Sequence, residues 1–169
     1  MKWKIWLLSL FFFLSGCSSI PDLEEYNGKS LRIGVISDPP EVREENITFS
    51  EIAFHEIENK TAKEHDAIFV TKEHLYQASE GKSSEVYLNS AIPVFFIESS
   101  SHIPFTVDES EFGQNWEWSP GNNFAVGIFS STESDSLNSW GYGQYNDEKT
   151  NEHVKGVFSR IFTTIEELK

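Results

Sequence analysis

Three short apolar segments of the chain have the pattern of buried β-strands. Residues 31–37 and 66–71 are dense in β-branched side chains, and residues 92–97 are apolar, with Pro93 near the start, where a missing donor is tolerated. Asp38-Pro39-Pro40 ends the first segment, because proline lacks an N–H and restricts the residue before it. Such short runs, buried on both faces, predict the strands of a parallel sheet.

Segments with helical spacing lie between these strands. After the first strand, apolar residues recur with a helical period and Ser50 can act as N-cap, which predicts a helix over residues 51–63. Those apolar residues are Phe49, Ile52, Ala53 and Ile57. A shorter helix is predicted over residues 73–80, ended by Gly81, and residues 86–88 add a turn or helix. Strands and helices alternating at this spacing predict right-handed βαβ units.

The second half of the chain has a different pattern. Residues 99–123 are rich in Ser, Pro, Glu and Gly and are predicted to form a long loop, which is often a functional element. Residues 124–129 and 139–145 are strand-like, and the polar residues 132–136 connect them. This arrangement predicts an antiparallel hairpin that extends the sheet.

The C-terminal segment is predicted to be an amphipathic helix. Thr150 or Asn151 can cap it, and its apolar residues form one stripe over about four turns. The stripe consists of Val154, Val157, Phe158, Ile161, Ile165 and Leu168. The expected fold class is therefore α/β: a three-strand parallel βαβαβ core, extended by a β-hairpin and covered by helices that include this one.

The N-terminus has the regions of a secretory signal peptide in the correct order. Lys2 and Lys4 precede an apolar run over residues 5–14, and small residues follow it. The run is about 10 residues long, whereas a membrane-spanning helix needs roughly 20. The segment Leu14-Ser15-Gly16-Cys17 resembles the lipobox of bacterial lipoproteins. The resemblance implies cleavage after Gly16, a diacylglyceryl thioether on Cys17, and attachment to the membrane through that lipid.

Three parts of the chain follow from this interpretation. Residues 1–16 form the signal peptide, residues 17–30 form the lipidated N-terminus and a tether, and residues 31–169 form a single globular α/β domain. The tether is predicted because the segment is polar and acidic and has no sustained period. The alternative is an N-terminal arm that folds onto the domain, with Leu23 and Tyr26 as its anchors.

The chain is strongly acidic. It contains 13 Lys and Arg against 27 Asp and Glu, a net charge of −14, and loss of Lys2 and Lys4 with the signal peptide leaves 11 against 27, or −16. Such a charge repels nucleic-acid phosphates and anionic head groups, so no nucleic-acid partner is expected. The charge favours solubility, or the recruitment of cations or a basic partner. Cys17 is the only cysteine, so no disulfide can form within the chain.

Sequence motifs of catalysis and cofactor binding are missing. Asp38-Pro39-Pro40 stands where a dinucleotide-binding protein has its Gly-rich turn, and prolines offer no N–H to a phosphate. The sequence also lacks a P-loop, a Gly-x-Ser-x-Gly elbow and a His-Glu-x-x-His zinc motif. The chain is therefore not expected to be an enzyme, and no cofactor or metal is assigned to it.

Polar residues at the strand ends form the candidate ligand site. In an open parallel sheet, ligands bind beyond the carboxyl ends of the strands. If these ends converge, Asp38, His74, Glu98 and His102 could bind a small molecule or a metal, or could serve as acid and base in a hydrolase. The alternative is that these residues are polar only because strands end in solvent.

Aromatic residues in the second half allow two interpretations. The residues are Trp116, Trp118, Trp140, Tyr142 and Tyr145. Exposed rings could stack on the glycans of a cell envelope, whereas buried rings would close a core beneath the long loop. General burial tendencies favour the core.

Together with the lipobox, two segments resemble short lipoproteins of Bacillus-type Gram-positive bacteria. They are residues 65–74 and the tail that includes Trp140-Gly141-Tyr142-Gly143 and residues 159–166. That group has no assigned activity, so the resemblance implies a location and no functional residues. We therefore expect a binding or accessory module on the extracytoplasmic face of the cell membrane. Its expected partners are the membrane itself, through Cys17, and possible envelope proteins.

Overall fold

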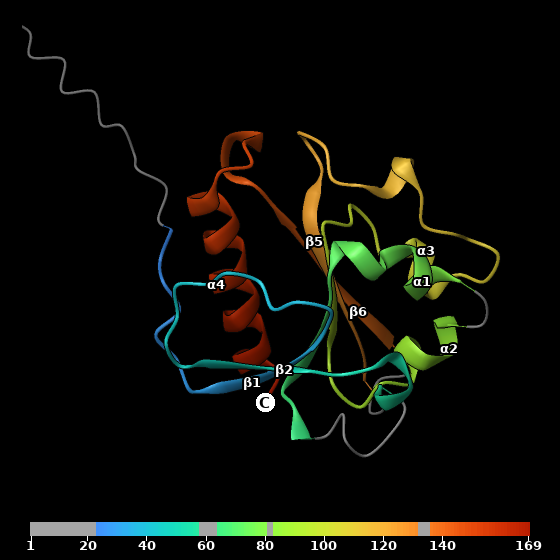
Figure 1. Ribbon diagram of the computed structural model, residues 1–169, viewed down its shortest axis with the longest axis horizontal. Helices are drawn as coiled ribbons and strands as arrows, with labels where there is room; N and C mark the ends of the chain where they lie inside the picture. The colour runs from blue at the N-terminus through green and yellow to red at the C-terminus, as the bar shows by residue number, and fades with distance from the viewer. Residues whose placement is uncertain (1–22, 58–63, 81–82, 132–135) are drawn as a thin grey trace, which may run out of the picture.

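The chain forms one mixed β-sheet in a computed structural model that describes residues 23–57, 64–80, 83–131 and 136–169 (Figure 1). The predicted signal peptide and the lipobox-like segment lie outside the described residues. The strands are β1 Leu31–Ile36, β2 Ile47–Glu51, β3 Ala67–Val70, β4 Val94–Ile97, β5 Asn123–Ser131 and β6 Ser136–Gly143. Their order across the sheet is β2-β1-β3-β4-β5-β6. The first four strands in this order are parallel to one another, and β5 and β6 are antiparallel to their neighbours.

Helices cover both faces of the sheet. The longer ones are α1 Leu75–Ser79, α2 Ser83–Leu88, α3 Ile103–Thr106 and α4 Asn151–Glu167, and the short 3₁₀ turns are η1 Phe54–Glu56, η3 Lys72–His74, η4 Gln114–Trp116 and η5 Tyr145–Asp147. In Figure 1, α4 lies on one side of the sheet and α1, α2 and α3 lie on the other. The hydroxyl of Thr150 caps α4 by accepting a hydrogen bond from the His153 N–H. The α/β class and the C-terminal helix are thus confirmed.

The central strands supply two hydrophobic cores, one on each face. Along β3, Ala67 and Phe69 face α4, whereas Ile68 and Val70 face α1–α3, and all four side chains are fully buried. Strand β4 alternates in the same way. Because side chains alternate across a strand, a run that is apolar at every position has to be covered on both faces.

The predicted helix over residues 51–63 is wrong where the structure describes it. Residues 47–51 form β2, which pairs in parallel with β1, and only residues 54–56 form a 3₁₀ turn. Ile47 and Phe49 pack against the α4 core, whereas Thr48 and Ser50 are exposed. This two-residue alternation is that of an edge strand, and it overlaps the apolar spacing that suggested a helix. The parallel part of the sheet therefore has four strands instead of three.

The remaining predicted elements agree with the structure. The three predicted strands correspond to β1, β3 and β4, and the hairpin corresponds to β5 and β6. Residues 73–80 contain the end of η3 and α1, and residues 86–88 belong to α2. The long loop, residues 99–123, contains α3 and η4 and otherwise has little regular structure.

The described part of the predicted tether is an arm packed against α4. Tyr26 is buried, and its ring centroid lies 5.9 Å from that of Phe162. Arg43 donates a hydrogen bond to the Leu23 carbonyl at 3.0 Å. Residues 23–30 thus follow the alternative interpretation, in which Leu23 and Tyr26 anchor the segment to the domain.

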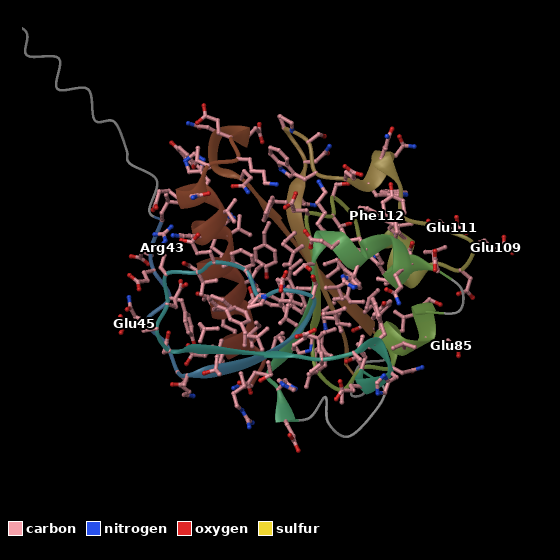
Figure 2. All side chains as sticks on the ribbon, in the orientation of Figure 1. Arg43, Glu45, Glu85, Glu109, Glu111 and Phe112 are labelled. Atoms are coloured by element: carbon pink, nitrogen blue, oxygen red, sulfur yellow. The ribbon has the colours of Figure 1, made fainter. Side chains whose placement is uncertain are left out.

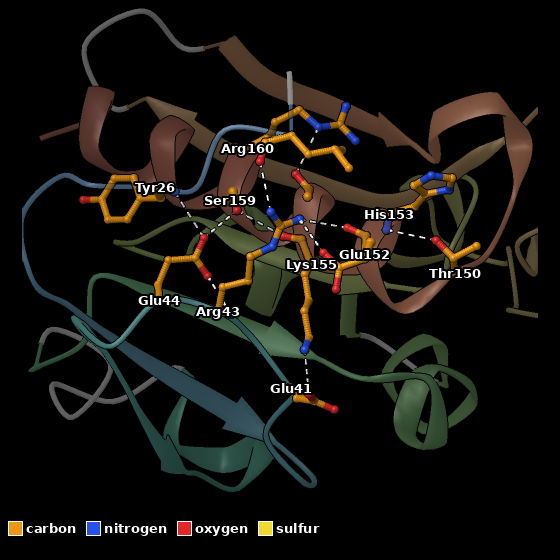
Figure 3. Close-up of polar contacts among 12 residues, drawn as sticks. Tyr26, Glu41, Arg43, Glu44, Thr150, Glu152, His153, Lys155, Ser159 and Arg160 are labelled. Carbon is orange, nitrogen blue, oxygen red and sulfur yellow. Dashed lines mark hydrogen bonds and ion pairs between the residues drawn. The ribbon is translucent and has the colours of Figure 1, made fainter. Parts of the chain in front are cut away.

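A buried carboxylate joins this arm to the loop after β1 and to α4 (Figure 3). Glu44 is 5% exposed, and its Oε1 accepts hydrogen bonds from the Tyr26 N–H at 3.2 Å and from the Ser159 hydroxyl at 2.5 Å. Its Oε2 accepts one from the Arg43 N–H at 3.1 Å. A buried carboxylate is stable only when donors satisfy it, and here three parts of the chain supply them.

Replacing Glu44 with glutamine tests this junction. The amide nitrogen of Glu44→Gln would face a donor, and the charge that strengthens the hydrogen bonds is lost, so we expect the free energy of unfolding to fall by about 1.5–3 kcal/mol. Chemical denaturation measures the change. Glu45→Gln is the matched control, because Glu45 is exposed at the periphery (Figure 2), and its effect should stay within about 0.5 kcal/mol. Equal effects of the two substitutions would contradict a special role for Glu44.

Candidate functional site

A cavity of about 340 Å³ lies beyond the carboxyl ends of β1, β3 and β4. Asp38 and Glu41 line it from the loop after β1, Lys72 and Glu73 from the start of η3, and Glu98 from the residue after β4. Its apolar lining consists of Pro39, Pro40, Ile97, Phe124, Val154 and Phe158. The first turns of α4 close the cavity against the sheet. The predicted strand-end location is thus a real concavity, and it contains two of the four predicted site residues, Asp38 and Glu98.

Three lysines, Lys72, Lys149 and Lys155, neutralise part of this carboxylate cluster. The Glu98 Oε2 accepts a hydrogen bond from the Lys149 ammonium at 2.5 Å, and the same oxygen lies 3.7 Å from the Lys72 Nζ. Lys155 pairs with Glu41 at 2.6 Å. Lys149 and Lys155 are functional candidates that sequence reasoning did not identify, because nothing in the helical pattern shows that the start of α4 crosses this edge of the sheet.

Two carboxylates of the cavity have no ion-pair partner among the described residues. These are Asp38 and Glu73, and both side chains are exposed. The four acidic residues that line the cavity outnumber its two lysines, Lys72 and Lys155. The cavity therefore combines an apolar wall with a negative mouth, which attracts a positively charged group.

His74 does not join Asp38 and Glu98. It lines a second concavity of about 670 Å³, which also contains Ser37, Glu51 and Phe54, and its ring centroid lies 6.1 Å from that of Phe54. This concavity lies beside the core formed with α1–α3, whereas the first lies beside the core formed with α4. The strand ends are thus divided between the two faces.

His102 lines neither concavity. It precedes α3, and its Nδ1 lies 3.0 Å from the Thr106 hydroxyl oxygen. Burial lowers the pKa of its imidazole below the ordinary value of about 6.5. His102 is therefore a half-buried residue of the α3 turn, and the structure does not bring the four predicted residues together.

The described residues contain no group of three or more His, Cys, Asp and Glu side chains placed to hold a metal ion. Asp38 and Glu98 share their cavity with lysines, which compete with a metal for the carboxylate oxygens.

Four of the five aromatic residues singled out in the second half contribute to the cores, whereas the Tyr145 ring lies against His153, with ring centroids 5.3 Å apart. Trp118 and Trp140 are half-buried against the α4 core, and Trp116 packs against the opposite one. Tyr142 is buried, and its hydroxyl donates to the Thr164 hydroxyl at 2.8 Å. These rings therefore do not form an exposed platform for a glycan.

The pH dependence of stability tests the environment of His102. Because its pKa is lower in the folded protein than in the unfolded chain, His102 stabilises the fold fully above about pH 6.5, and this contribution is lost as the pH falls through the lowered pKa. We expect wild type to lose more free energy of unfolding between pH 8 and pH 5 than His102→Gln, as measured by urea denaturation. Identical losses in both proteins would show that His102 titrates normally.

In comparisons with known protein families, curated proteins and solved structures, the chain matches none. None of its described helices combines the length and the apolar character that a membrane crossing requires.

Proposed function

We propose that this protein is a lipid-anchored, extracytoplasmic binding protein, and that its strand-end cavity takes a small molecule carrying a positively charged amine. The proposed ligand class rests on one observation. A pair of exposed carboxylates, Asp38 and Glu73, lies at the mouth of a cavity with an apolar wall. We propose binding rather than catalysis, since the candidate acids and bases lie in separate places.

The proposed location rests on the N-terminal sequence. The lipobox-like segment ending at Cys17 follows a signal-peptide pattern, and two acyl chains on one thioether-linked glycerol anchor a protein stably. The strong acidity of the domain fits this location, because repulsion from anionic head groups holds the globular part away from the bilayer.

The proposed ligand fits the shape and charge of the cavity. An ammonium group is attracted to Asp38 and Glu73, while a short alkyl chain covers the apolar surface near Phe124 and Phe158. A cavity of about 340 Å³ is at the small end of ligand-binding pockets, so the ligand is small. The net negative charge of the chain raises the local concentration of such a cation.

The lipid anchor is tested by Cys17→Ala. Without the thiol no thioether forms, so we expect the variant to leave the membrane fraction or to remain as uncleaved precursor, while the wild type stays in the membrane. Cell fractionation followed by immunoblotting measures both outcomes, and Ser18→Ala is the control. Retention of mature Cys17→Ala in the membrane would refute lipid attachment at this position.

The ligand class is tested with 1,5-diaminopentane and its uncharged analogue 1,5-pentanediol. We expect saturable stabilisation of the wild type by the diamine alone, as ligand that binds only the folded state raises the melting temperature. Asp38→Asn should weaken binding about tenfold, which corresponds to about 1.4 kcal/mol, whereas Glu45→Gln should not change it. Thermal unfolding and calorimetric titration measure the two effects. Equal responses to diamine and diol, or an unchanged affinity of Asp38→Asn, would reject the proposal.

A further inference from the structure

One edge of the sheet, β6, has an open side. The strand order places β6 beside β5 and gives it no second neighbouring strand among the described residues. Leu137, Asn138 and Ser139 are exposed, and Leu137 is one of three large apolar side chains exposed in the described chain, at 40%. Helix α4 packs on the face of the strand near Tyr142, so it leaves this first half of β6 accessible.

The first half of this edge lacks the features that normally prevent strands from pairing, whereas at its end Arg160 donates a hydrogen bond to the Gly143 carbonyl at 2.6 Å. Exposed edges are usually protected by charged side chains, by proline or by short length. Strand β6 is eight residues long and reads Ser-Leu-Asn-Ser-Trp-Gly-Tyr-Gly, with no charge and no proline.

The opposite edge of the sheet is protected. Strand β2 has five residues and ends in Glu51, whose side chain is exposed. The two edges therefore differ in length and in charge, and β6 is the one suited to pairing.

Charge identifies the partner. The hairpin strands β5 and β6 contain no Asp, Glu, Lys or Arg, although the chain as a whole carries −14. Two copies of such an acidic protein repel each other over most of their surfaces and can approach where the charge is absent. A basic partner would be attracted to the acidic surfaces instead of this neutral edge.

We propose that β6 pairs antiparallel with β6 of a second copy of the chain, so that the two sheets become one. A twofold axis makes such an interface self-complementary, since each copy presents the same uncharged strand to the other. Pairing over Leu137, Asn138 and Ser139 satisfies main-chain groups on the open side of this part of the strand without burying any charge. This inference depends on neither the proposed lipid anchor nor the proposed ligand.

Cysteine crosslinking in cells tests the pairing with the full chain. Leu137, Asn138 and Ser139 are replaced by cysteine one at a time, and Thr48→Cys on the exposed opposite edge is the matched control. After mild oxidation, we expect a reducible dimer of the chain from at least one β6 variant, in excess of that from wild type and from Thr48→Cys. Absence of such a dimer, or equal amounts from Thr48→Cys, would overturn the proposal. A reducible adduct with a different protein would overturn the choice of a second copy as partner.

A charge substitution provides the second measurement. Asn138→Lys places two like charges close together across the twofold axis, so the dissociation constant of the dimer should rise at least tenfold, whereas Thr48→Lys makes the same change in net charge and should not raise it. Sedimentation velocity of the full chain in detergent micelles measures both. Raising the salt concentration should lower the dissociation constant of the wild-type dimer, because salt screens the repulsion between the two acidic domains. A wild-type chain that remains monomeric at every salt concentration would overturn the proposal.

Discussion

Strand β3 is buried on both faces, and the rest of the fold is arranged around that burial. Phe69 is its central residue: its ring centroid lies 5.7–6.2 Å from those of Phe49 on β2, Phe95 on β4, and Phe158 and Phe162 on α4, so that it connects these two strands to the helix. Ile68 and Val70 make the corresponding contacts with the opposite core. Because each face has to be covered, the chain needs helices on both sides, and the open space remains at the strand ends and the outer edges.

The alternation that builds the two cores also divides the strand-end residues. Ser37 and Asp38 are adjacent in the chain, yet Ser37 lines one concavity and Asp38 the other. Glu73 and His74 are separated in the same way. The residues that follow the strands thus divide between the two faces, with Asp38, Glu73 and Glu98 on the α4 side and His74 on the α1 side. A site built on the α4 side therefore uses carboxylates and lysines without an imidazole.

The parts of the fold that were predictable are those with one clear period. The stripe of α4 and the continuous apolar runs of β3 and β4 each fit a single kind of element, and the structure contains them. Strand β2 was missed because Phe49, Ile52 and Ile57 fit a helical spacing, although Phe49 and Ile52 belong to opposite cores. Local spacing cannot reveal that division.

The candidate site was predictable only in its location. The rule for parallel sheets placed it beyond the strand ends, and Asp38 and Glu98 do line a cavity there. The separation of His74 and His102, and the arrival of Lys149 and Lys155, depend on how α3 and α4 pack. These contacts join segments far apart in the chain, and the local sequence pattern does not predict them.

The arm that precedes β1 also determines how the domain would respond to a pulling force. It runs beside α4 from Gly156, where Leu23 fills the space that a larger residue would need, to Glu166, which accepts a hydrogen bond from the Lys29 N–H. Tension on the N-terminus therefore loads these contacts in shear before it reaches β1. Because Glu44 holds both Tyr26 and Ser159, it passes part of that load to the longest helix and spares the sheet.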